Sequence, residues 1–400
     1  MPCLQIRNTF LMISIFWSCF IIILYTYVGY GILLYLLVKF RRLIKGRRLI
    51  PRDLNNLPSM TLIVAAYNEE AIIEKKIQNT FSLAYPAGKC FYIFVTDGSD
   101  DNTASIISRY PQIKLMHDPR RSGKINAVHR AMQEVNTSIV VFTDANTILN
   151  KEALINIARN YSDVQVGAVA GEKRVAIADS SDATAGEGFY WKYESFLKKL
   201  DSELYSVMGA AGELFSIRTK LYQPVNPTAI LDDFLISMMI AGKNYRVVYE
   251  PAAYALEAGS ANIKEELKRK IRIAAGGIQS VIWLRKLLNP LAYPTLSFQY
   301  ISHRVLRWTI APFCLVALFL ANIFLVFQKA GTIYDVLLVA QIVFYTAAII
   351  GWQFEKKEIK IKTFFIPFYF CVMNYAVIRG IGRYYAKSQS ASWEKAERKI

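Results

Sequence analysis

Five residues that follow apolar, strand-like stretches have the side chains and the spacing to bind a nucleotide. Ala66 is followed by Asn68 and Glu69, so a small residue and a carboxylate stand where the chain leaves its first such stretch. A small side chain lets a ligand approach the backbone closely. Asp97 comes directly after a second apolar stretch, where a carboxylate often meets a base or a ribose. Lys124 stands at the expected start of a helix, where a lysine can meet phosphate together with the helix N-terminus.

Each of these positions also has a structural interpretation, which the residues alone leave open. Asn68 could cap the following helix while acids occupy its first turn. The stretch from Asp97 to Thr103 could form a turn and then a capped helix, and Lys124 could simply be solvated. Nucleotide binding and helix capping therefore stand as alternatives.

Short β-branched or aromatic runs alternate with amphipathic stretches between residues 60 and 251, and these elements must position the polar residues. Such alternation predicts an α/β domain with a Rossmann-like, mainly parallel sheet that helices cover on both faces. The ligand cleft of such a domain lies at the carboxyl ends of the strands. The strand candidates are Thr61–Ala65, Phe91–Thr96, Ile113–His117, Ile139–Thr143, Val166–Ala170 and Tyr245–Tyr249.

The motifs of this region, taken in order, resemble those of membrane-bound family-2 glycosyltransferases, which include the cellulose, hyaluronan and poly-N-acetylglucosamine synthases. After Asn-Glu-Glu and Asp-Gly-Ser come Asp144-Ala145-Asn146, the small-residue loop Gly209–Glu213, Asp232-Asp233, and Arg269-Lys270-Ile271-Arg272-Ile273. The resemblance covers about residues 58–310, and the order of the motifs is more specific than any one of them. It implies a GT-A fold and a nucleotide-sugar donor, with a UDP-sugar as the family expectation.

The resemblance implies a metal site at Asp144 and Asn146, which match the DxD signature of GT-A enzymes. A hard divalent cation, Mg²⁺ or Mn²⁺, takes oxygen ligands and neutralises the diphosphate as the leaving group departs. Asn146 replaces the second aspartate of the signature, so it offers a carbonyl oxygen without negative charge.

The resemblance also implies that Asp233, with Asp232 beside it, carries the catalytic chemistry. In the processive synthases a comparable acidic pair supplies the general base, and an inverting transfer needs one carboxylate to take the proton of the acceptor hydroxyl. Paired acids at the start of a helix could instead be ordinary N-terminal charges.

Arg269 and Arg272 fall where the family has Gln-x-x-Arg-Trp. Arg272 keeps the arginine, which suits a diphosphate, while Arg269 and Ile273 replace the glutamine and the tryptophan. Without that aromatic platform, processive polymerisation is not implied. The same stretch could also be a basic amphipathic helix on a membrane surface.

Apolar stretches at both ends of the sequence predict helices that cross a membrane. Residues 10–40 are almost uncharged and exceed the roughly 20 residues that a spanning helix needs. We expect one transmembrane helix there and no cleaved signal peptide, whose core of roughly 7–15 residues is much shorter. Apolar segments of near-spanning length return at about Val305–Phe327, Ile333–Gln353 and Phe364–Tyr385.

Basic residues indicate the orientation. Arg41, Arg42 and Lys45 follow the first helix, and the positive-inside rule places them, with the α/β domain, in the cytosol. If all three late segments crossed, the C-terminus would lie outside. The basic residues near that end favour the inside, so one late segment could lie in the interface: Arg379, Arg383, Lys387, Lys395, Arg398 and Lys399.

Composition agrees with a membrane protein. The chain has 400 residues, of which 54% are hydrophobic, and a formal net charge of +17. Its basic residues cluster beside apolar runs, which favours lipid headgroups over nucleic acid. We expect an anchor with a basic flank over residues 1–55, a catalytic domain over 56–262, interface helices over 263–304, and membrane helices with a basic tail over 305–400.

The sequence thus predicts an inverting hexosyltransferase of the cell (inner) membrane, multi-pass with a cytosolic catalytic domain. It would move a sugar from a nucleotide-sugar donor to a lipid-linked or polysaccharide acceptor in cell-surface or exopolysaccharide synthesis. One alternative is a non-processive transferase that adds one sugar to a lipid carrier. Another is a membrane protein that binds a nucleotide sugar without turnover. No nucleic-acid partner is expected, and nothing indicates an oligomeric state.

Overall fold

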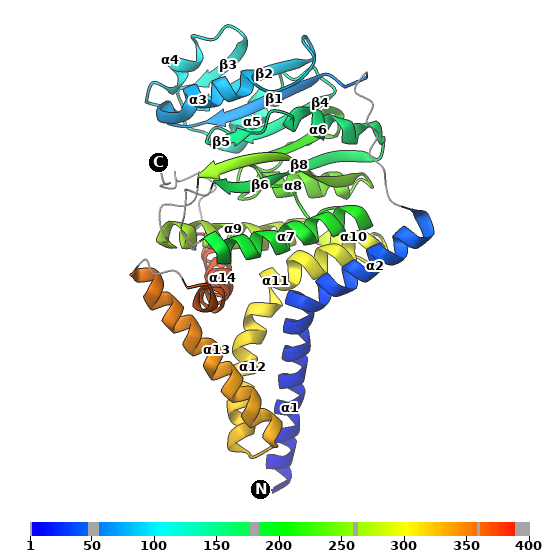
Figure 1. Ribbon diagram of the computed structural model, residues 1–400, viewed down its shortest axis with the longest axis vertical. Helices are drawn as coiled ribbons and strands as arrows, with labels where there is room; N and C mark the ends of the chain where they lie inside the picture. Colours follow the sequence, from blue (N-terminus) through cyan, green and yellow to red (C-terminus); the bar gives the residue numbers. More distant parts are fainter. Residues whose placement is uncertain (1, 47–55, 177–183, 259–262, 358–360, 389–400) are drawn as a thin grey trace.

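The computed structural model describes residues 2–46, 56–176, 184–258, 263–357 and 361–388. Figure 1 shows an α/β domain at the top, a layer of helices directly below it, and long helices that extend away from the domain. The layer below the domain contains α7 (Thr184–Leu204), α9 (Ile263–Trp283) and α10 (Pro294–Tyr300), and the extending helices are α1 (Pro2–Leu24), α12 (Ile310–Phe327) and α13 (Thr332–Lys356).

The domain is built on one eight-stranded sheet with the strand order β3-β2-β1-β4-β7-β6-β8-β5. Its strands are β1 (Met60–Ala66), β2 (Cys90–Asp97), β3 (Ile113–Asp118), β4 (Ile139–Asp144), β5 (Thr147–Leu149), β6 (Val166–Ala176), β7 (Leu214–Arg218) and β8 (Arg246–Ala258). β1 pairs in parallel with β2 and β4, β2 with β3, and β6 with β8. The mainly parallel sheet is therefore confirmed, and β1, β2 and β4 end at one edge.

All six predicted strands are present, and two further strands were not predicted. β7 has five residues and pairs antiparallel with both β4 and β6, so it interrupts the parallel pattern. β5 has three residues and pairs antiparallel with β8. Segments this short carry too little periodicity to be recognised from sequence.

Helices cover both faces of the sheet. Successive side chains of β1 point to opposite faces, so they contribute to a separate hydrophobic core on each side. Leu62 and Val64 pack in one core with residues of α3 (Glu70–Phe81) and α6 (Ala153–Arg159). Ile63 packs in a second core with residues of α5 (Lys124–Met132) and α8 (Asp232–Ala241). The shorter helices are α4 (Thr103–Ile107), η2 (Asn160–Ser162), η3 (Thr219–Leu221), η4 (Arg285–Leu288), η5 (Ile301–Val305) and α11 (Leu306–Trp308).

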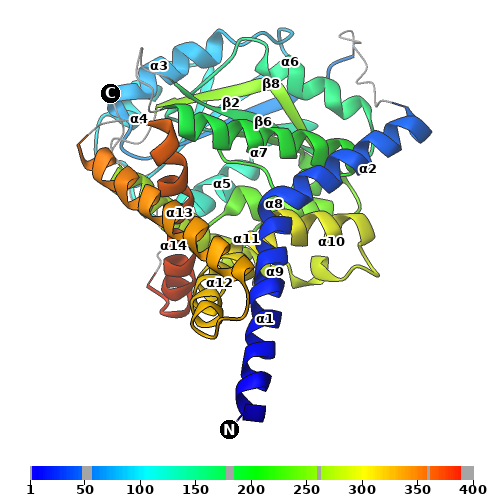
Figure 2. The same cartoon turned by 60° about the horizontal axis from the view of Figure 1, so that its bottom comes forward.

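The N-terminal apolar stretch is helical throughout, as expected, but it bends. After α1 comes a π-helical turn, η1 (Tyr25–Gly29), and then α2 (Tyr30–Lys45), which lies beside α7 in both views (Figures 1 and 2). Gly31 permits this contact, because a Cβ there would lie 2.8 Å from the Tyr193 hydroxyl. Packing on the domain therefore directs α2 away from the line of α1.

Among the described residues, four helical stretches are long and apolar enough to cross a membrane: Arg7–Lys45, Ile310–Phe327, Thr332–Lys356 and Lys362–Tyr385. The last of these is α14 (Lys362–Tyr385), which Figure 1 views nearly end-on and Figure 2 shows at greater length. α14 packs under α9, where a Cβ at Gly380 would lie 2.6 Å from the Ala274 Cβ. Its direction therefore differs from that of α1, α12 and α13.

The two ends of the chain are packed together. Phe16 of α1 shares a buried cluster with Leu318 of α12, and the Trp17 indole donates a hydrogen bond to the Tyr334 hydroxyl over 3.3 Å. Nearer the domain, the fully buried Asp201 carboxylate contacts the Tyr30 hydroxyl and lies 2.5 Å from His303 Nδ1. Helices from both termini thus form one platform beneath the sheet.

Candidate active site

The carboxyl end of β4 and the start of α5 bring a carboxylate and an ammonium group together. Asp144 is the last residue of β4, and Lys124 is the first residue of α5. Lys124 Nζ donates a hydrogen bond to Asp144 Oδ1 over 2.6 Å. The predicted position of Lys124 at a helix start is confirmed, and it forms an ion pair with the residue predicted to bind metal.

The acidic pair lies at the same place. Asp232 and Asp233 are the first two residues of α8, as expected. The loop before β7 passes close to them: a Cβ on Gly212 would lie 3.4 Å from Asp233 Oδ2 and 3.4 Å from Lys124 Nζ. Gly212 therefore lets this loop lie against both charged groups, and the cavity that it lines with Lys124 and Asp144 has a volume of only about 10 Å³.

Burial and neighbouring charges together raise the pKa values of Asp233, Lys124 and Asp144. Burial, reinforced by the neighbouring Asp232, raises the pKa of Asp233 to about 7. Burial works to lower the pKa of Lys124, but the carboxylates of Asp144, Asp232 and Asp233 outweigh it and raise that pKa. Burial also raises the pKa of Asp144, which Lys124 opposes. The site thus holds a positively charged lysine and one carboxyl group that can exchange a proton near neutral pH.

Arg272 approaches the same carboxylates from α9. Its guanidinium donates to the Ile230 carbonyl over 3.4 Å, and its Nε is buried without a hydrogen-bond partner in the described part of the chain. Burial lowers the pKa of Arg272, while Asp232 and Asp233 act to raise it. A buried guanidinium with an unused donor suits an anionic ligand.

Arg269 belongs to a neighbouring network instead. It pairs with Glu266 over 3.0 Å on its own helix. Beside it, the buried Lys173 ammonium lies 2.5 Å from Glu213 and also pairs with Glu257. Sequence analysis cited Glu213 only as part of a small-residue loop and missed Lys173 and Glu257, because their partners are distant in the sequence.

The predicted nucleoside-binding residues occupy the edge where β1 and β2 end. Asn68 has a φ of 52° and exchanges hydrogen bonds with Asp100 in the loop after β2. It does not cap α3, whose N-cap is the buried Glu69, and no side-chain cap bond is present there. The capping interpretation of Asn68 is thus wrong, because its side chain holds the adjacent loop.

Asp97 supports the turn that leads to Lys124. Its Oδ2 accepts hydrogen bonds from the backbone N–H groups of Ser122 and Gly123, over 2.9 and 2.6 Å. Its Oδ1 is buried without a hydrogen-bond partner within the described chain, with Arg130 3.8 Å away. Asp97 therefore has a structural role and a second oxygen that a ligand could engage, while Ala66 closes β1 beside it.

A buried lysine that sequence analysis missed supports the Asp144 turn. Lys76 Nζ donates to Thr143 Oγ1 and to the Thr147 carbonyl, over 3.0 and 2.8 Å. Burial lowers the pKa of Lys76 to about 7. These bonds bracket the turn that carries Asp144 and Asn146 and hold it in place.

The donor set fits a divalent cation that is shared with a substrate. Among the residues described, no three His, Cys, Asp or Glu side chains gather closely enough to hold a metal by themselves. Mg²⁺ is commonly bound by one or two carboxylates together with substrate phosphates and water, and the single buried carboxylate of Asp144 is compatible with such a shared site. The Lys124 ammonium already pairs with Asp144 Oδ1, so a cation there would share this carboxylate with the lysine.

Comparisons with known proteins agree with this geometry. Residues 61–225 match the profile described as "Glycosyl transferase family 2". The poly-beta-1,6-N-acetyl-D-glucosamine synthase of Staphylococcus aureus strain COL is 26% identical over 239 residues, which cover 56% of this chain and 56% of that protein. The matched part thus spans little more than half the length of these relatives. The synthase of the same name from Staphylococcus epidermidis is 23% identical over 402 residues and covers 94% of this chain and 93% of its own.

A solved structure shares the fold over almost the whole chain. The mannosyltransferase from Pyrobaculum calidifontis in complex with GDP-Man and Mn²⁺ superposes with a TM-score of 0.72 at 23% identity, and the match covers 95% of this chain and 99% of that one. This likeness confirms the expected GT-A fold. The profile match over residues 61–225, the named synthases and the shared fold together support a glycosyltransferase family 2 domain in this chain.

Proposed function

We propose that the chain transfers a sugar from a nucleotide-sugar donor, a UDP-sugar by expectation, to a membrane-associated acceptor with inversion at the anomeric carbon. The observation that carries this proposal is the arrangement around Lys124. Its ammonium group is 2.6 Å from Asp144, and Gly212 lies against both this group and the carboxylate of Asp233.

Asp233 is proposed as the general base. The acceptor hydroxyl would give its proton to Asp233 while its oxygen attacks the anomeric carbon, and the nucleoside diphosphate would leave with the bonding electrons. A base with a pKa near the working pH is effective, and Asp232 helps to hold the pKa of Asp233 near 7. No covalent intermediate with the protein is required.

Positive side chains would receive the charge of the leaving group. Lys124 and Arg272 surround the acidic cluster and suit the diphosphate. Arg269 would act on it less directly, because Glu266 already pairs with it. When bound at Asp144 and Asn146, Mg²⁺ or Mn²⁺ would supply further neutralisation of the diphosphate. Ala66, Asn68, Glu69 and Asp97 are proposed to face the nucleoside.

The acceptor class follows from the relatives and from the helices. The Staphylococcus relatives are named as polysaccharide synthases, and one of them aligns with nearly the whole chain. A surface or exopolysaccharide is therefore the proposed product. Ile273, which stands where the resemblance has tryptophan, favours the second candidate, a transferase that adds a single sugar to a lipid carrier.

We propose three membrane crossings, formed by α1, α12 and α13, with α14 along the interface under α9. One crossing, α1, precedes the domain, and two, α12 and α13, follow it. The chain therefore returns to the side of the domain before α14 begins, and the described end of α14 lies on that side. Arg379, Arg383 and Lys387 then lie on the cytosolic side with Arg42, as the positive-inside rule requires. This arrangement removes the conflict that three late crossings would create.

Release of nucleoside diphosphate by the detergent-purified protein tests the proposal. A panel of UDP- and GDP-sugars would be assayed with Mn²⁺ or Mg²⁺ for wild type, Asp233→Asn, and the exposed control Asp335→Asn. We expect turnover of one donor that collapses only in Asp233→Asn, is lost with EDTA, and returns with the preferred metal. Activity that survives in Asp233→Asn would reject the assigned base. UDP binding without turnover of any donor would support the non-catalytic alternative.

A further inference from the structure

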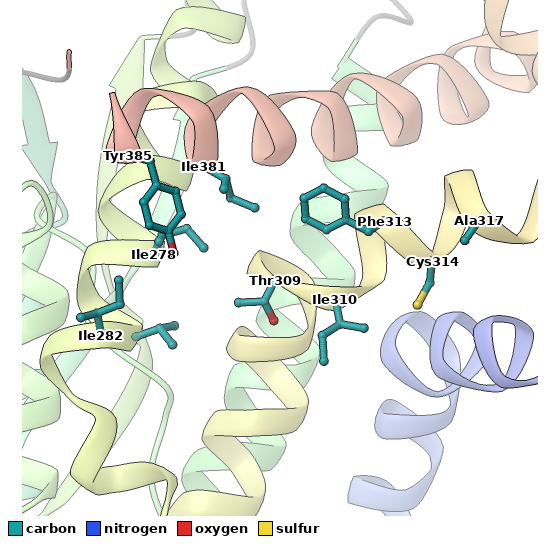
Figure 3. A pocket seen from close by; sticks show the side chains of 10 residues that line it. Ile278, Ile282, Thr309, Ile310, Phe313, Cys314, Ala317, Ile381 and Tyr385 are labelled. Atoms are coloured by element: carbon teal, nitrogen blue, oxygen red, sulfur yellow. The ribbon is translucent and has the colours of Figure 1, made fainter. Parts of the chain in front are cut away.

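A cavity of about 510 Å³ opens among α9, α12 and α14, on the side of the domain that faces the long helices (Figure 3). Figure 3 shows side chains from all three helices lining it, among them Ile278 and Ile282 of α9, Phe313 of α12 and Ile381 of α14. The lining is almost wholly apolar, and the Thr309 hydroxyl is already bonded to the Val305 carbonyl. The volume of the cavity falls in the range of roughly 300–1,000 Å³ that is typical of small-molecule sites.

The mouth of the cavity is also apolar. Ile282, Ile310 and Phe313 are 40%, 46% and 49% exposed in the isolated chain. Ile310 and Phe313 belong to a proposed spanning helix, so this face would meet hydrocarbon and not water. Apart from the Tyr385 hydroxyl and the Cys314 thiol, the lining offers little to a polar ligand, whereas a hydrocarbon chain could enter directly from the bilayer.

One aromatic layer separates the cavity from the proposed base. Phe234 follows Asp233, and its ring packs edge-on against that of Trp308, with the centroids 5.3 Å apart. Trp308 directly precedes Thr309, which lines the cavity. A Cβ on Gly277 would lie 2.7 Å from the Trp308 ring, so the glycine lets α9 come close enough to keep this layer thin.

α9 also connects the two places. It carries Arg272 at the acidic cluster and Ile278 at the cavity wall. Six residues of helix correspond to about 9 Å, less than the length of a lipid headgroup with one sugar and the first carbons of its tail. Along the helix axis the two sites are thus within reach of one lipid, whose headgroup would pass around α9 because Arg272 and Ile278 point about 120° apart.

We propose that this cavity holds the hydrocarbon tail of the acceptor lipid, so that its headgroup is presented to Asp233. The inference rests on the proposed transfer to a membrane-associated acceptor and deepens it by naming a lipid-linked acceptor and the site of its tail. A tail held in place would restrict the headgroup to the region above Phe234 and Trp308. Binding of the tail would thus accelerate transfer by orienting the acceptor hydroxyl, since reacting groups must be aligned for transfer.

A chain-length series tests the cavity through kinetics in proteoliposomes. Methyl, octyl and dodecyl β-N-acetylglucosaminides would serve as acceptors for wild type and for two cavity-filling variants, Ile282→Trp and Ala317→Phe. The matched control is Ile342→Trp, because Ile342 is a similarly exposed isoleucine on α13, outside the cavity. We expect KM to fall from methyl to dodecyl in every variant, but at least about tenfold further in wild type and control than in the filled variants.

Turnover of the methyl glycoside should stay within about twofold of wild type in the filled variants, since no catalytic group is altered. Partitioning of long chains into the bilayer lowers KM for every variant alike. An equal chain-length gain in the filled variants and the control would therefore overturn the proposal.

A second measurement does not depend on turnover. A dodecyl glycoside with a diazirine at the end of its tail would be photolysed with each protein, and the labelled peptides would be mapped by mass spectrometry. We expect labels on α9, α12 and α14 around the cavity in wild type and Ile342→Trp, and their loss in Ile282→Trp. Labels spread over α13 to the same extent would overturn the cavity site. Labelling of the cavity without turnover would instead leave the tail site standing and count against the proposed transferase activity.

Discussion

Two glycines of the same loop, Gly209 and Gly212, should respond to alanine in opposite ways. Gly209 has a φ of +86°, and a Cβ there would lie 2.0 Å from the Phe234 ring. The backbone strain costs about 1–3 kcal/mol and the overpacking about another 1–3 kcal/mol. Gly212 has an ordinary φ, and its Cβ would only make van der Waals contact with Asp233 and Lys124 at 3.4 Å.

We therefore expect Gly209→Ala to lose stability and Gly212→Ala to lose activity. A loss of about 2–6 kcal/mol corresponds to a fall in Tm of roughly 4–20 °C for a domain of this size. Gly212→Ala should keep its Tm within about 3 °C, because the substitution gains or loses less than about 1 kcal/mol. Its kcat should fall roughly 10–100-fold, because the methyl group enters the space between the base and the ammonium group.

Thermal unfolding in detergent and nucleoside diphosphate release from the same preparations measure both effects. Equal losses of Tm in the two variants would show that the loop around Gly212 is packed solidly and leaves no room for substrate. Full activity in Gly212→Ala would show that the reacting atoms do not pass between Asp233 and Lys124. Either result would refute the placement of the site.

Three further predictions concern the charged groups. Lys124→Met should lower kcat/KM at least about 100-fold, measured by nucleoside diphosphate release, because it removes the cation beside Asp144; unchanged activity would exclude a role in phosphate binding. The kcat/KM of wild type should rise with pH through about 7, because Asp233 must lose its proton to act as a base and its pKa is raised to about 7. At the acid end we expect a rise of ~10-fold per pH unit. A kcat/KM that does not change with pH between about 5.5 and 8 would contradict this prediction. Lys173→Met should destabilise the domain by about 3–5 kcal/mol in thermal unfolding, because it leaves Glu213 and Glu257 buried without their partner. The exposed Lys268→Met is the control for both lysine variants, and an equal Tm loss there would count against the buried-pair argument.

Local signals in the sequence were sufficient for most of the fold and for the starts of the key helices. The strand that ends at Asp144 is a run of buried β-branched and aromatic residues, and Asp232 and Asp233 stand at a helix start with acids in its first turn. Both features depend on neighbouring residues, so a sequence pattern can reveal them.

Contacts between distant residues could not be predicted in the same way. Nothing near Lys173 in the sequence indicates its pairing with Glu257, and nothing near Lys76 indicates that it supports the Asp144 turn. The bend between α1 and α2 lies at the π-helical turn Tyr25–Gly29, where Gly29 and the following Gly31 give a local signal, but the packing of α2 on α7 depends on residues far away in the sequence. Such features appear only once the chain is folded.

The packing of the first helix against the last third of the chain has a consequence for biosynthesis. Trp17 and its partner Tyr334 are separated by 317 residues. At roughly 5–20 residues per second, the ribosome needs about 15–60 s to produce the partner after the first helix has emerged. During that interval the Phe16 face of α1 lacks its partners on α12 and must be covered by other apolar groups. The platform beneath the sheet can therefore close only after α12 and the start of α13 have been synthesised, so its assembly is a late event in the folding of the chain.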